Sequence, residues 1–350
     1  MISTEVLPCK NLTVAKLLSS RSQPIAISME DVATEFTGRC FQTCRLCYGS
    51  FGTDSPEMPF DQVVELERKF KRMGINTSHG TGGEVLMHGD IGRILPLFGD
   101  DGFQLEIDTN GVLIDRPMAD LLAKYRVRVT VGLESLDPEI YQWYRGTNHL
   151  DRVLGGLDLL KDRGLTPAVQ TVVANYKGYP GRYDPVNNVL NLVDQVTNMG
   201  LPISLIQYRL LGRATQSTNE VVDLTRLEKD ELTRRINLLP SLQRQLVNGD
   251  IPFQRQLVVR GDIECSGCLG GLTRANIGVN GDVFMCNWRR EETYGNIFTE
   301  EFTPIVARLQ QRRWQKLDEI EACKPLNCDY RRREQCFGPC LISKMVQPQA

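Results

Sequence analysis

The chain has 350 residues, a length that supports one large domain or two smaller ones. Hydrophobic residues make up 41% and charged residues 24%, and the formal net charge is -2, so there is no global basic field to hold a nucleic-acid backbone. No apolar run approaches the roughly 20 residues of a membrane span, and the first residues lack the continuous apolar core of a secretory signal. We therefore expect a cytoplasmic protein that binds neither nucleic acid nor membrane.

Strand and helix patterns alternate through the first two thirds of the chain. The strand candidates are apolar or β-branched runs, namely a strand within Ile25 to Thr37, then Ile75 to Ser78, Phe103 to Asp108, Val127 to Gly132, Ala168 to Ala174 and Ser204 to Tyr208. Apolar residues at three- and four-residue spacing predict amphipathic helices at Phe60 to Met73, Arg116 to Tyr125, His149 to Arg163 and Asn187 to Met199. This alternation predicts six parallel strands with helices packed on the sheet.

The 11 cysteines fall into two groups on either side of a cysteine-free middle. Three lie at Cys40, Cys44 and Cys47, none lies between residues 48 and 264, and seven lie between residues 265 and 340. Because the cytoplasm keeps thiols reduced, these groups predict metal ligation or catalysis in place of disulfides. Cys9 lies outside both groups.

The first group reads CFQTCRLCYG, with the spacing C-x3-C-x2-C, on the loop after the first predicted strand. Three thiolates around a four-iron cluster leave one iron open to a substrate or cofactor, whereas zinc in a structural site is usually closed by four ligands. A zinc knuckle completed by a distant ligand such as His79 or His88 is the alternative.

This spacing, followed by an aromatic residue, resembles the radical S-adenosylmethionine (SAM) superfamily. Further motifs of that family follow in order along the chain. The second strand ends in a match to the family's GGE motif, whose backbone and carboxylate would hold the amino group of SAM, at Gly82, Gly83 and Glu84. The third strand ends in a match to the TNG turn, at Thr109, Asn110 and Gly111.

The fourth strand continues into GLESLDPE, which is similar to the family's SLDG-x-DPE segment. Gly132 stands where a serine is usual and Glu134 where an aspartate is usual. The resemblance implies that Glu134, Ser135 and Arg145 contact the ribose or the carboxylate of SAM, although a charged helix start capped by Asp137 would also explain Glu134. Near the sixth strand, the resemblance places Leu211 beside the adenine, where packing is an equally simple role.

The second cysteine group resembles the SPASM extension of radical SAM enzymes, which carries auxiliary [4Fe-4S] clusters. By this resemblance an inner auxiliary cluster is held by Cys265, Cys268, Cys286 and Cys340. An outer cluster is held at three irons by Cys323, Cys328 and Cys336, with no further cysteine after Cys340 to complete it. A pair of zinc ribbons is the alternative.

The resemblance implies an α/β fold: a partial (β/α)6 TIM-like barrel of the radical SAM type, with a C-terminal SPASM extension rich in loops and a short hairpin. We expect an N-terminal segment at residues 1–24, the radical SAM core at 25–214, a helical linker at 215–260 and the SPASM domain at 261–350.

The resemblance also implies the chemistry. A [4Fe-4S] cluster that takes electrons from a reductant such as flavodoxin or ferredoxin would cleave SAM to a 5'-deoxyadenosyl radical, which abstracts a substrate hydrogen atom. One or two auxiliary [4Fe-4S] clusters could accept a second electron, so oxidation or cross-linking at carbon is expected ahead of a redox-neutral change. No individual catalytic side chain is identified from the sequence.

Many SPASM enzymes act on ribosomal peptides, so we expect a role in the maturation of a peptide natural product. Only 39 residues precede Cys40, so we expect any recognition of a leader peptide to come from a separate protein and not from a fused domain. The alternatives are a dehydrogenase or epimerase that acts on a sugar, an aminocyclitol or another small metabolite, and a non-catalytic metal-binding scaffold.

Overall fold

The computed structural model describes residues 3–7, 25–208, 211–216, 219–236, 238–241, 270–287 and 289–319. The chain divides into two compact units. The first comprises Met1–Phe36, Met58–His79 and Asp262–Ala350, and the second comprises Thr37–Glu57 and Gly80–Gly261.

The second unit repeats a strand followed by a helix. Its strands are neighbours in chain order, from the end of β4 (Thr77–Gly82) to β5 (Gln104–Thr109), β6 (Arg128–Gly132), β7 (Ala168–Val173) and β8 (Ile203–Gln207). The pairs β5–β6, β6–β7 and β7–β8 are parallel. The carboxyl ends of these strands therefore meet at one edge of the sheet, which is where ligand sites of parallel α/β folds form.

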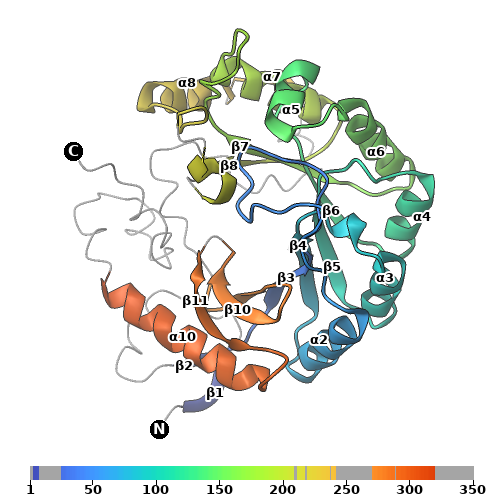
Figure 1. Cartoon of the computed structure of the whole chain (residues 1–350), viewed down its shortest axis with the longest axis vertical. Coiled ribbons are helices and arrows are strands. Elements are labelled where there is room, and N and C mark those ends of the chain that lie inside the picture. The colour runs from blue at the N-terminus through green and yellow to red at the C-terminus, as the bar shows by residue number, and fades with distance from the viewer. Residues whose placement is uncertain are drawn as a thin grey trace. The chain divides into compact units, whose positions relative to one another are not determined.

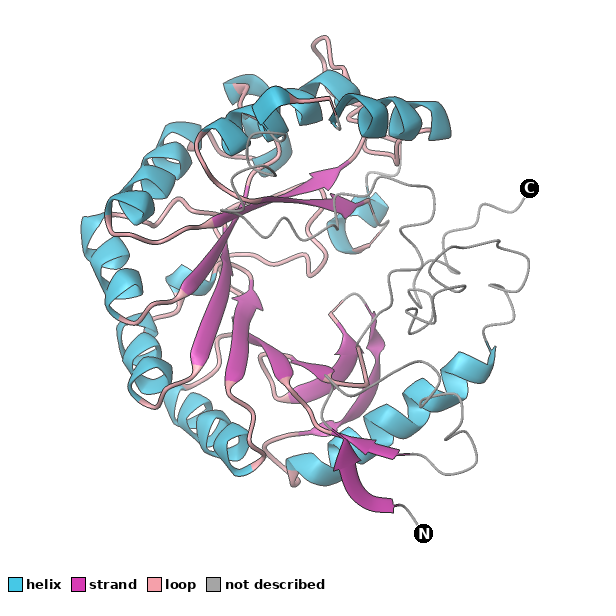
Figure 2. Cartoon of the chain, turned by 180° about the vertical axis from the view of Figure 1, so that it is seen from behind, coloured by secondary structure: helices cyan, strands magenta, loops and turns pink. Residues whose placement is uncertain are grey.

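Helices cover one face of these strands, as Figures 1 and 2 show for α3, α4, α6 and α7. The helices of this unit are α3 (Ile91–Asp100), α4 (Arg116–Lys124), α5 (Pro138–Arg145), α6 (Leu150–Asp162), α7 (Pro185–Asn198) and α8 (Arg226–Ile236). Two short 3-10 helices, η2 (Val85–Met87) and η3 (Gly212–Gln216), follow β4 and β8. Alternate strand residues such as Leu105 and Ile107 on β5 are buried, as expected of strands with one face under helices.

Three of these helices begin at the same kind of cap. The side chains of Asp115, Asp137 and Asp184 accept hydrogen bonds from backbone N–H groups in the first turns of α4, α5 and α7. A proline stands in the first turn of each helix, where its missing N–H group costs nothing. These caps fix where the loops after β5, β6 and β7 end.

The first unit contains a parallel pair and a mixed set of strands. The parallel pair is β1 (Ser3–Leu7) and β2 (Ile25–Ile27), and the remaining strands and helices are β3 (Asp31–Thr37), α2 (Phe60–Arg72), β9 (Arg274–Ile277), β10 (Asp282–Cys286), β11 (Arg289–Asn296) and α10 (Phe302–Glu319). The strand β9 pairs in parallel with β3, whereas β9, β10 and β11 are antiparallel. The turn before β10 contains Gly281 with φ of 87°, a conformation that favours glycine, and Cys286 ends that strand.

The predicted α/β class with a parallel sheet is confirmed, and the six predicted strands correspond to β3 to β8. The helices α3 and α5 were not among those predicted from periodicity.

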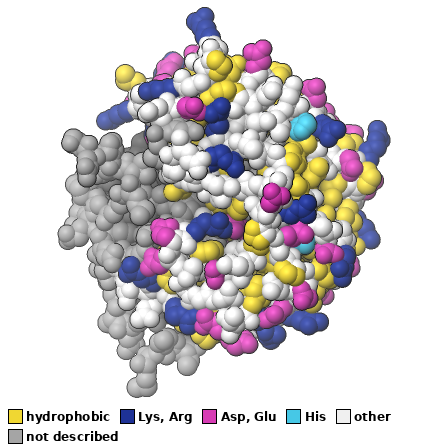
Figure 3. All heavy atoms as spheres, in the orientation of Figure 1, with side chains coloured by type: hydrophobic (Ala, Val, Ile, Leu, Met, Phe, Trp, Pro, Cys, Tyr) yellow, Lys and Arg dark blue, Asp and Glu magenta, His cyan; other side chains and the backbone are white. Residues whose placement is uncertain are grey.

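Acidic and basic side chains are interspersed on the face shown in Figure 3. Among the described residues, no helix is long and apolar enough to span a bilayer.

Candidate functional site

The cysteine loop, residues 40–47, follows β3 and lies wholly in the second unit. Its three cysteines are free thiols of intermediate exposure. The loop is docked by its backbone on the end of α5, because Thr43 N donates to the carbonyl of Arg145 at 3.1 Å and Arg45 N donates to that of Tyr144 at 3.0 Å. The loop position is thereby tied to a helix that begins at Pro138, far along the chain.

Two glycines bring the end of β4 against the start of this loop. Gly82 has φ of 124°, a conformation that side chains other than glycine rarely adopt. A Cβ at Gly83 would lie 2.6 Å from the carbonyl oxygen of Gly38 and would also overlap that of Arg39. The backbone of Gly83 donates to Thr37 O at 2.8 Å and that of Glu84 donates to Arg39 O at 2.8 Å. The first glycine is thus required by conformation and the second by close approach.

The Glu84 side chain joins the ends of β4 and β5. Its Oε1 accepts hydrogen bonds from Leu86 N at 3.1 Å and from Thr109 Oγ1 at 2.6 Å, and its Oε2 accepts one from Asn110 N at 2.6 Å. Burial raises the pKa of Glu84, and these three donors only partly oppose that effect. A cationic ligand group beside the carboxylate would favour its charged form.

Asn110 contributes a second unusual group at the same edge. Its Oδ1 accepts from Val112 N at 3.0 Å, which fixes the amide orientation. Its Nδ2 is buried and has no hydrogen-bond partner in the described part of the chain. An unsatisfied buried donor is costly unless a ligand supplies the acceptor.

Arg145 and Glu134 form a buried fork-to-fork ion pair. Arg145 Nε donates to Glu134 Oε2 at 2.6 Å, and Arg145 Nη2 donates to Glu134 Oε1 at 2.8 Å. Burial by itself lowers the pKa of Arg145, but Glu134 and Cys44 outweigh burial and hold that pKa above its ordinary range. The guanidinium therefore stays charged and is committed to Glu134, not left open toward the solvent.

Ser135 and Leu211 both make hydrogen bonds within the second unit. The Ser135 hydroxyl donates to Asn188 Oδ1 at 2.6 Å and accepts from Asp137 N at 3.1 Å, so it links the start of α5 to α7. Leu211 is half-buried, and its carbonyl accepts from Ala214 N at 3.0 Å. The single donor of the Ser135 hydroxyl is thus used within the protein, and one of its two acceptor positions is filled.

Gly212 and Arg213, which were not among the predicted site residues, contact the cysteine loop and support it. A Cβ at Gly212 would overlap the carbonyl oxygens of Cys47 and Tyr48. The Arg213 guanidinium donates to Cys44 O at 2.9 Å and to Phe51 O at 2.8 Å. The sequence signal at this point is the glycine itself, because glycine permits close approach of the backbone.

The thiols interact electrostatically with one another and with Glu84. Burial raises the pKa of Cys40 to about 12, and Cys44, Glu84 and Cys47 add to the rise. The described residues contain no group of three or more His, Cys, Asp or Glu that could hold a single metal ion, and His88 Nδ1 already accepts from Asp90 N at 3.0 Å. A four-iron cluster holds its thiolates farther apart than one zinc ion does, because each thiolate binds a different iron.

Most of the second cysteine group lies outside the described residues. The group members concerned are the predicted auxiliary ligands Cys265, Cys268, Cys323, Cys328, Cys336 and Cys340. Cys9, which belongs to neither group, also lies outside the described residues. Cys286 is described, at the end of β10, with intermediate exposure.

Two family models match the chain. The Radical SAM superfamily matches residues 34–194, which include the cysteine loop, Glu84, Asn110 and the Glu134–Arg145 pair. This matched region is a radical SAM domain. A SPASM model, described as an iron-sulfur cluster-binding domain, matches residues 268–329. The predicted radical SAM enzyme with a C-terminal SPASM domain is therefore confirmed at the level of the family.

Curated relatives of this radical SAM chain share part of its length. A probable GTP 3',8-cyclase of Archaeoglobus fulgidus is 32% identical over 136 residues, which cover 37% of this chain and 44% of that protein. The GTP 3',8-cyclase of Acidothermus cellulolyticus is 31% identical over 161 residues, which cover 42% of this chain and 44% of that protein. The similarity thus spans less than half the length of either relative.

Solved structures share the radical SAM fold over most of the chain. Streptococcus suis SuiB bound to its precursor peptide SuiA has a TM-score of 0.67 at 16% identity, covering 96% of this chain and 76% of that one. The enzyme anSMEcpe with bound AdoMet has a TM-score of 0.67 at 15% identity, covering 91% of each chain. At these identities the likeness concerns the fold alone.

The residues present fit the cluster and SAM that this family implies. Three thiols stand on one loop beside a buried carboxylate with a raised pKa. A buried amide N–H group on the neighbouring strand end lacks an acceptor within the described residues. Cationic iron would neutralise the thiolates, an ammonium group would neutralise Glu84, and a ligand oxygen could accept from Asn110.

Proposed function

We propose that the chain cleaves SAM reductively and uses the resulting radical to oxidise or cross-link a substrate at carbon. The single observation that carries the proposal is the meeting of the cysteine loop with Glu84 and Asn110 at one edge of the second unit. The backbone bonds of Gly83 and Glu84 to Thr37 and Arg39 tie these elements together at 2.8 Å each.

Cys40, Cys44 and Cys47 would bind a [4Fe-4S] cluster, and Glu84 would accept hydrogen bonds from the amino group of SAM. When bound, the reduced cluster would supply one electron to the sulfonium of SAM, and cleavage of a carbon-sulfur bond would give methionine and a 5'-deoxyadenosyl radical. The protein holds the loop in place through α5 and Arg213. It also keeps the Glu84 carboxylate out of water, which strengthens its pairing with an ammonium group.

The SPASM match supports auxiliary clusters in the first unit, with Cys286 as one ligand. We place an acceptor for a second electron there, so that the substrate would lose two hydrogens overall. A separate reductant, such as flavodoxin or ferredoxin, would supply the first electron.

For the substrate we propose a ribosomal peptide, with recognition of its leader by a separate protein. The shared fold with SuiB, a protein crystallised with its precursor peptide, supports this choice. A second candidate is a nucleotide, because the curated relatives that resemble this chain include GTP 3',8-cyclases and probable ones. Both candidates use the same site for SAM.

The test offers both substrates to anaerobically reconstituted full-length protein with SAM and dithionite. One arm contains deuterated peptides encoded by short open reading frames beside the coding gene, and the other contains GTP deuterated on its ribose. The proposal predicts deuterium in 5'-deoxyadenosine from a peptide, and a peptide product lighter by two hydrogens. Deuterium from GTP alone would select the second candidate, and a peptide product that gains solvent deuterium in heavy water would indicate epimerisation instead.

A further inference from the structure

The Arg145 guanidinium reaches past its ion pair to a thiol of the cysteine loop. Two of its nitrogens, Nε and Nη2, are held by Glu134, and the third, Nη1, lies 3.7 Å from Cys44 Sγ and 3.4 Å from Gln42 Oε1. An N–H group at this distance from sulfur is a hydrogen-bond donor to it. The pair with Glu134 therefore aims one edge of the guanidinium at Cys44.

Gly132 provides the room for this arrangement. A Cβ at this position would lie 2.6 Å from Arg145 Nη2, which is closer than real Cβ contacts occur. A serine or alanine on β6 would therefore move the guanidinium out of its place. The glycine that the sequence shows here, where a serine is usual in the resemblance, is explained by the position of Arg145.

Gln42 is oriented so that it cooperates with the arginine. Its Nε2 donates to Tyr141 OH at 3.2 Å and to Thr147 Oγ1 at 3.0 Å, which turns Oε1 toward Arg145 and Cys44. In the thiol form, Cys44 Sγ lies 3.8 Å from Gln42 Oε1 and can donate to it. A metal-bound thiolate has no proton to donate, so Oε1 would then accept from Arg145 alone.

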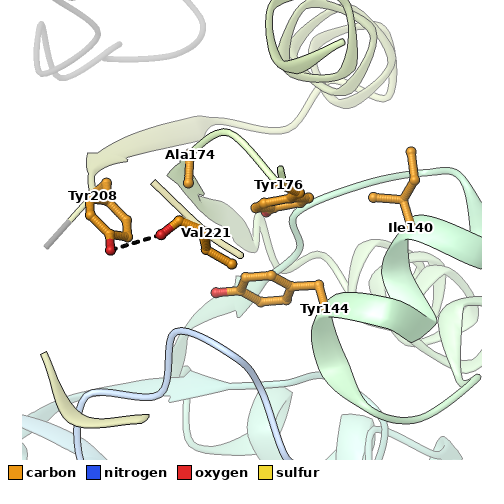
Figure 4. Close-up of a cluster of buried hydrophobic side chains, with 6 residues drawn as sticks. All are labelled: Ile140, Tyr144, Ala174, Tyr176, Tyr208 and Val221. Atoms are coloured by element: carbon orange, nitrogen blue, oxygen red, sulfur yellow. Dashed lines mark hydrogen bonds between the residues drawn. The ribbon is translucent and has the colours of Figure 1, made fainter. Parts of the chain in front are cut away.

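The remaining surroundings of Cys44 are largely apolar. Cys44 packs against a cluster whose buried members are shown in Figure 4, namely Ile140, Tyr144, Ala174, Tyr176, Tyr208 and Val221. Burial raises the pKa of the Cys44 thiol, and Arg145 opposes this both by its charge and by its hydrogen bond. A donor to sulfur carries more weight in such an environment than in water.

We infer that Arg145, clamped by Glu134, donates an N–H···S hydrogen bond to the Cys44 thiolate and makes the cluster bound there easier to reduce. The inference rests on the proposed function, since it requires a cluster on Cys40, Cys44 and Cys47. Reduction adds negative charge to the cluster, and a cationic donor at a ligand sulfur stabilises the reduced form more than the oxidised form. Arg145 is in this account a positioning and tuning residue, not one that contacts the reacting atoms.

The test is a redox titration of the SAM-free protein, followed by electron paramagnetic resonance. The signal of the Cys40→Ala/Cys44→Ala/Cys47→Ala variant is subtracted at each potential, so that the contribution of any auxiliary clusters is removed. Three variants are compared with the unchanged protein. Glu134→Gln keeps the donor but removes its counter-charge. The double variant Glu134→Met/Arg145→Met removes both charges without leaving one buried alone. Gly132→Ser displaces the guanidinium.

The inference predicts shifts of opposite sign. At a fixed applied potential the ratio of reduced to oxidised cluster should rise in Glu134→Gln and fall in the other two variants, each by about tenfold, which corresponds to about 59 mV for one electron. A residue that only stabilised the fold would not raise the ratio in one variant and lower it in another.

Unchanged ratios in Glu134→Gln and Gly132→Ser would overturn the inference, and a loss of SAM affinity at an unchanged ratio would assign Arg145 to the SAM carboxylate instead. If the subtraction leaves no cluster signal in the unchanged protein, the proposed function itself fails. The two failures are therefore distinguishable.

Discussion

Gly212 offers a direct test of how the loop after β8 supports the cysteine loop. Its φ is 53°, and a Cβ would overlap the carbonyl oxygens of Cys47 and Tyr48. The next residue, Arg213, donates from its backbone N to Cys47 O at 2.8 Å. A Gly212→Ala substitution should therefore strain the backbone and also push against the loop.

The matched control is Gly164→Ala. Gly164 also has positive φ, 76°, but nothing lies within 4 Å of a Cβ built there. It follows α6 and precedes β7, so it lies at the opposite edge of the sheet from the carboxyl ends of the strands. The control pays only the conformational cost of alanine in the left-handed region, about 1–2 kcal/mol.

Gly212→Ala should lower the free energy of unfolding by the same conformational amount. Strain in the Arg213–Cys47 hydrogen bond and overlap with the cysteine loop should lower it by about 1–2 kcal/mol more. At about 1–2 °C for each kcal/mol in a chain of this length, the melting temperature should fall further than in the control. The sharper difference is in iron content: Gly212→Ala should lose iron and SAM cleavage after reconstitution, whereas Gly164→Ala should keep both. Equal losses of stability with full iron in both variants would refute the bracing role of Gly212.

Three further predictions concern single side chains. Glu84→Gln should weaken SAM binding by about 10- to 100-fold in calorimetry, which is the worth of one charged hydrogen bond, whereas the control Glu106→Gln, at a partly exposed position, should not. Because burial raises the pKa of Glu84, SAM binding to the unchanged protein should also weaken as the pH falls through that pKa and the carboxylate is protonated. A flat pH profile would count against the pairing of Glu84 with the ammonium group. Arg213→Lys, which cannot donate to both Cys44 O and Phe51 O in the same geometry, should lower the iron retained during gel filtration, and full retention would show that the fork is dispensable. Cys286→Ala should remove up to about four irons per chain yet leave uncoupled SAM cleavage measurable, and unchanged iron would exclude Cys286 as a ligand.

The periodicity of the sequence predicted most of the second unit. The helices α4, α6 and α7 have clear apolar spacing and were placed within two residues of their observed ends. The helix α3 was missed because Gly92, Pro96 and Gly99 lower its helix propensity, and tertiary packing of Ile94, Leu95 and Phe98 overrides that signal. The helix α5 has only eight residues, too few for a periodic pattern.

The motifs predicted the cysteine loop, Glu84 and Asn110, because each is a short local pattern. The partners of Arg145 could not be read in the same way. Its contact with Gln42 joins residues 103 positions apart, and the need for a glycine at position 132 follows from that guanidinium alone. Such contacts depend on how the loop and α5 come together, which no local pattern records.

We propose that Cys40, Cys44 and Cys47 hold the cluster that cleaves SAM. The most direct measurement compares 5'-deoxyadenosine formation by the reconstituted protein and by its Cys40→Ala/Cys44→Ala/Cys47→Ala variant, under dithionite and without added substrate. We predict that the variant loses about four irons per chain and forms no 5'-deoxyadenosine. Continued formation of 5'-deoxyadenosine by the variant would contradict the account.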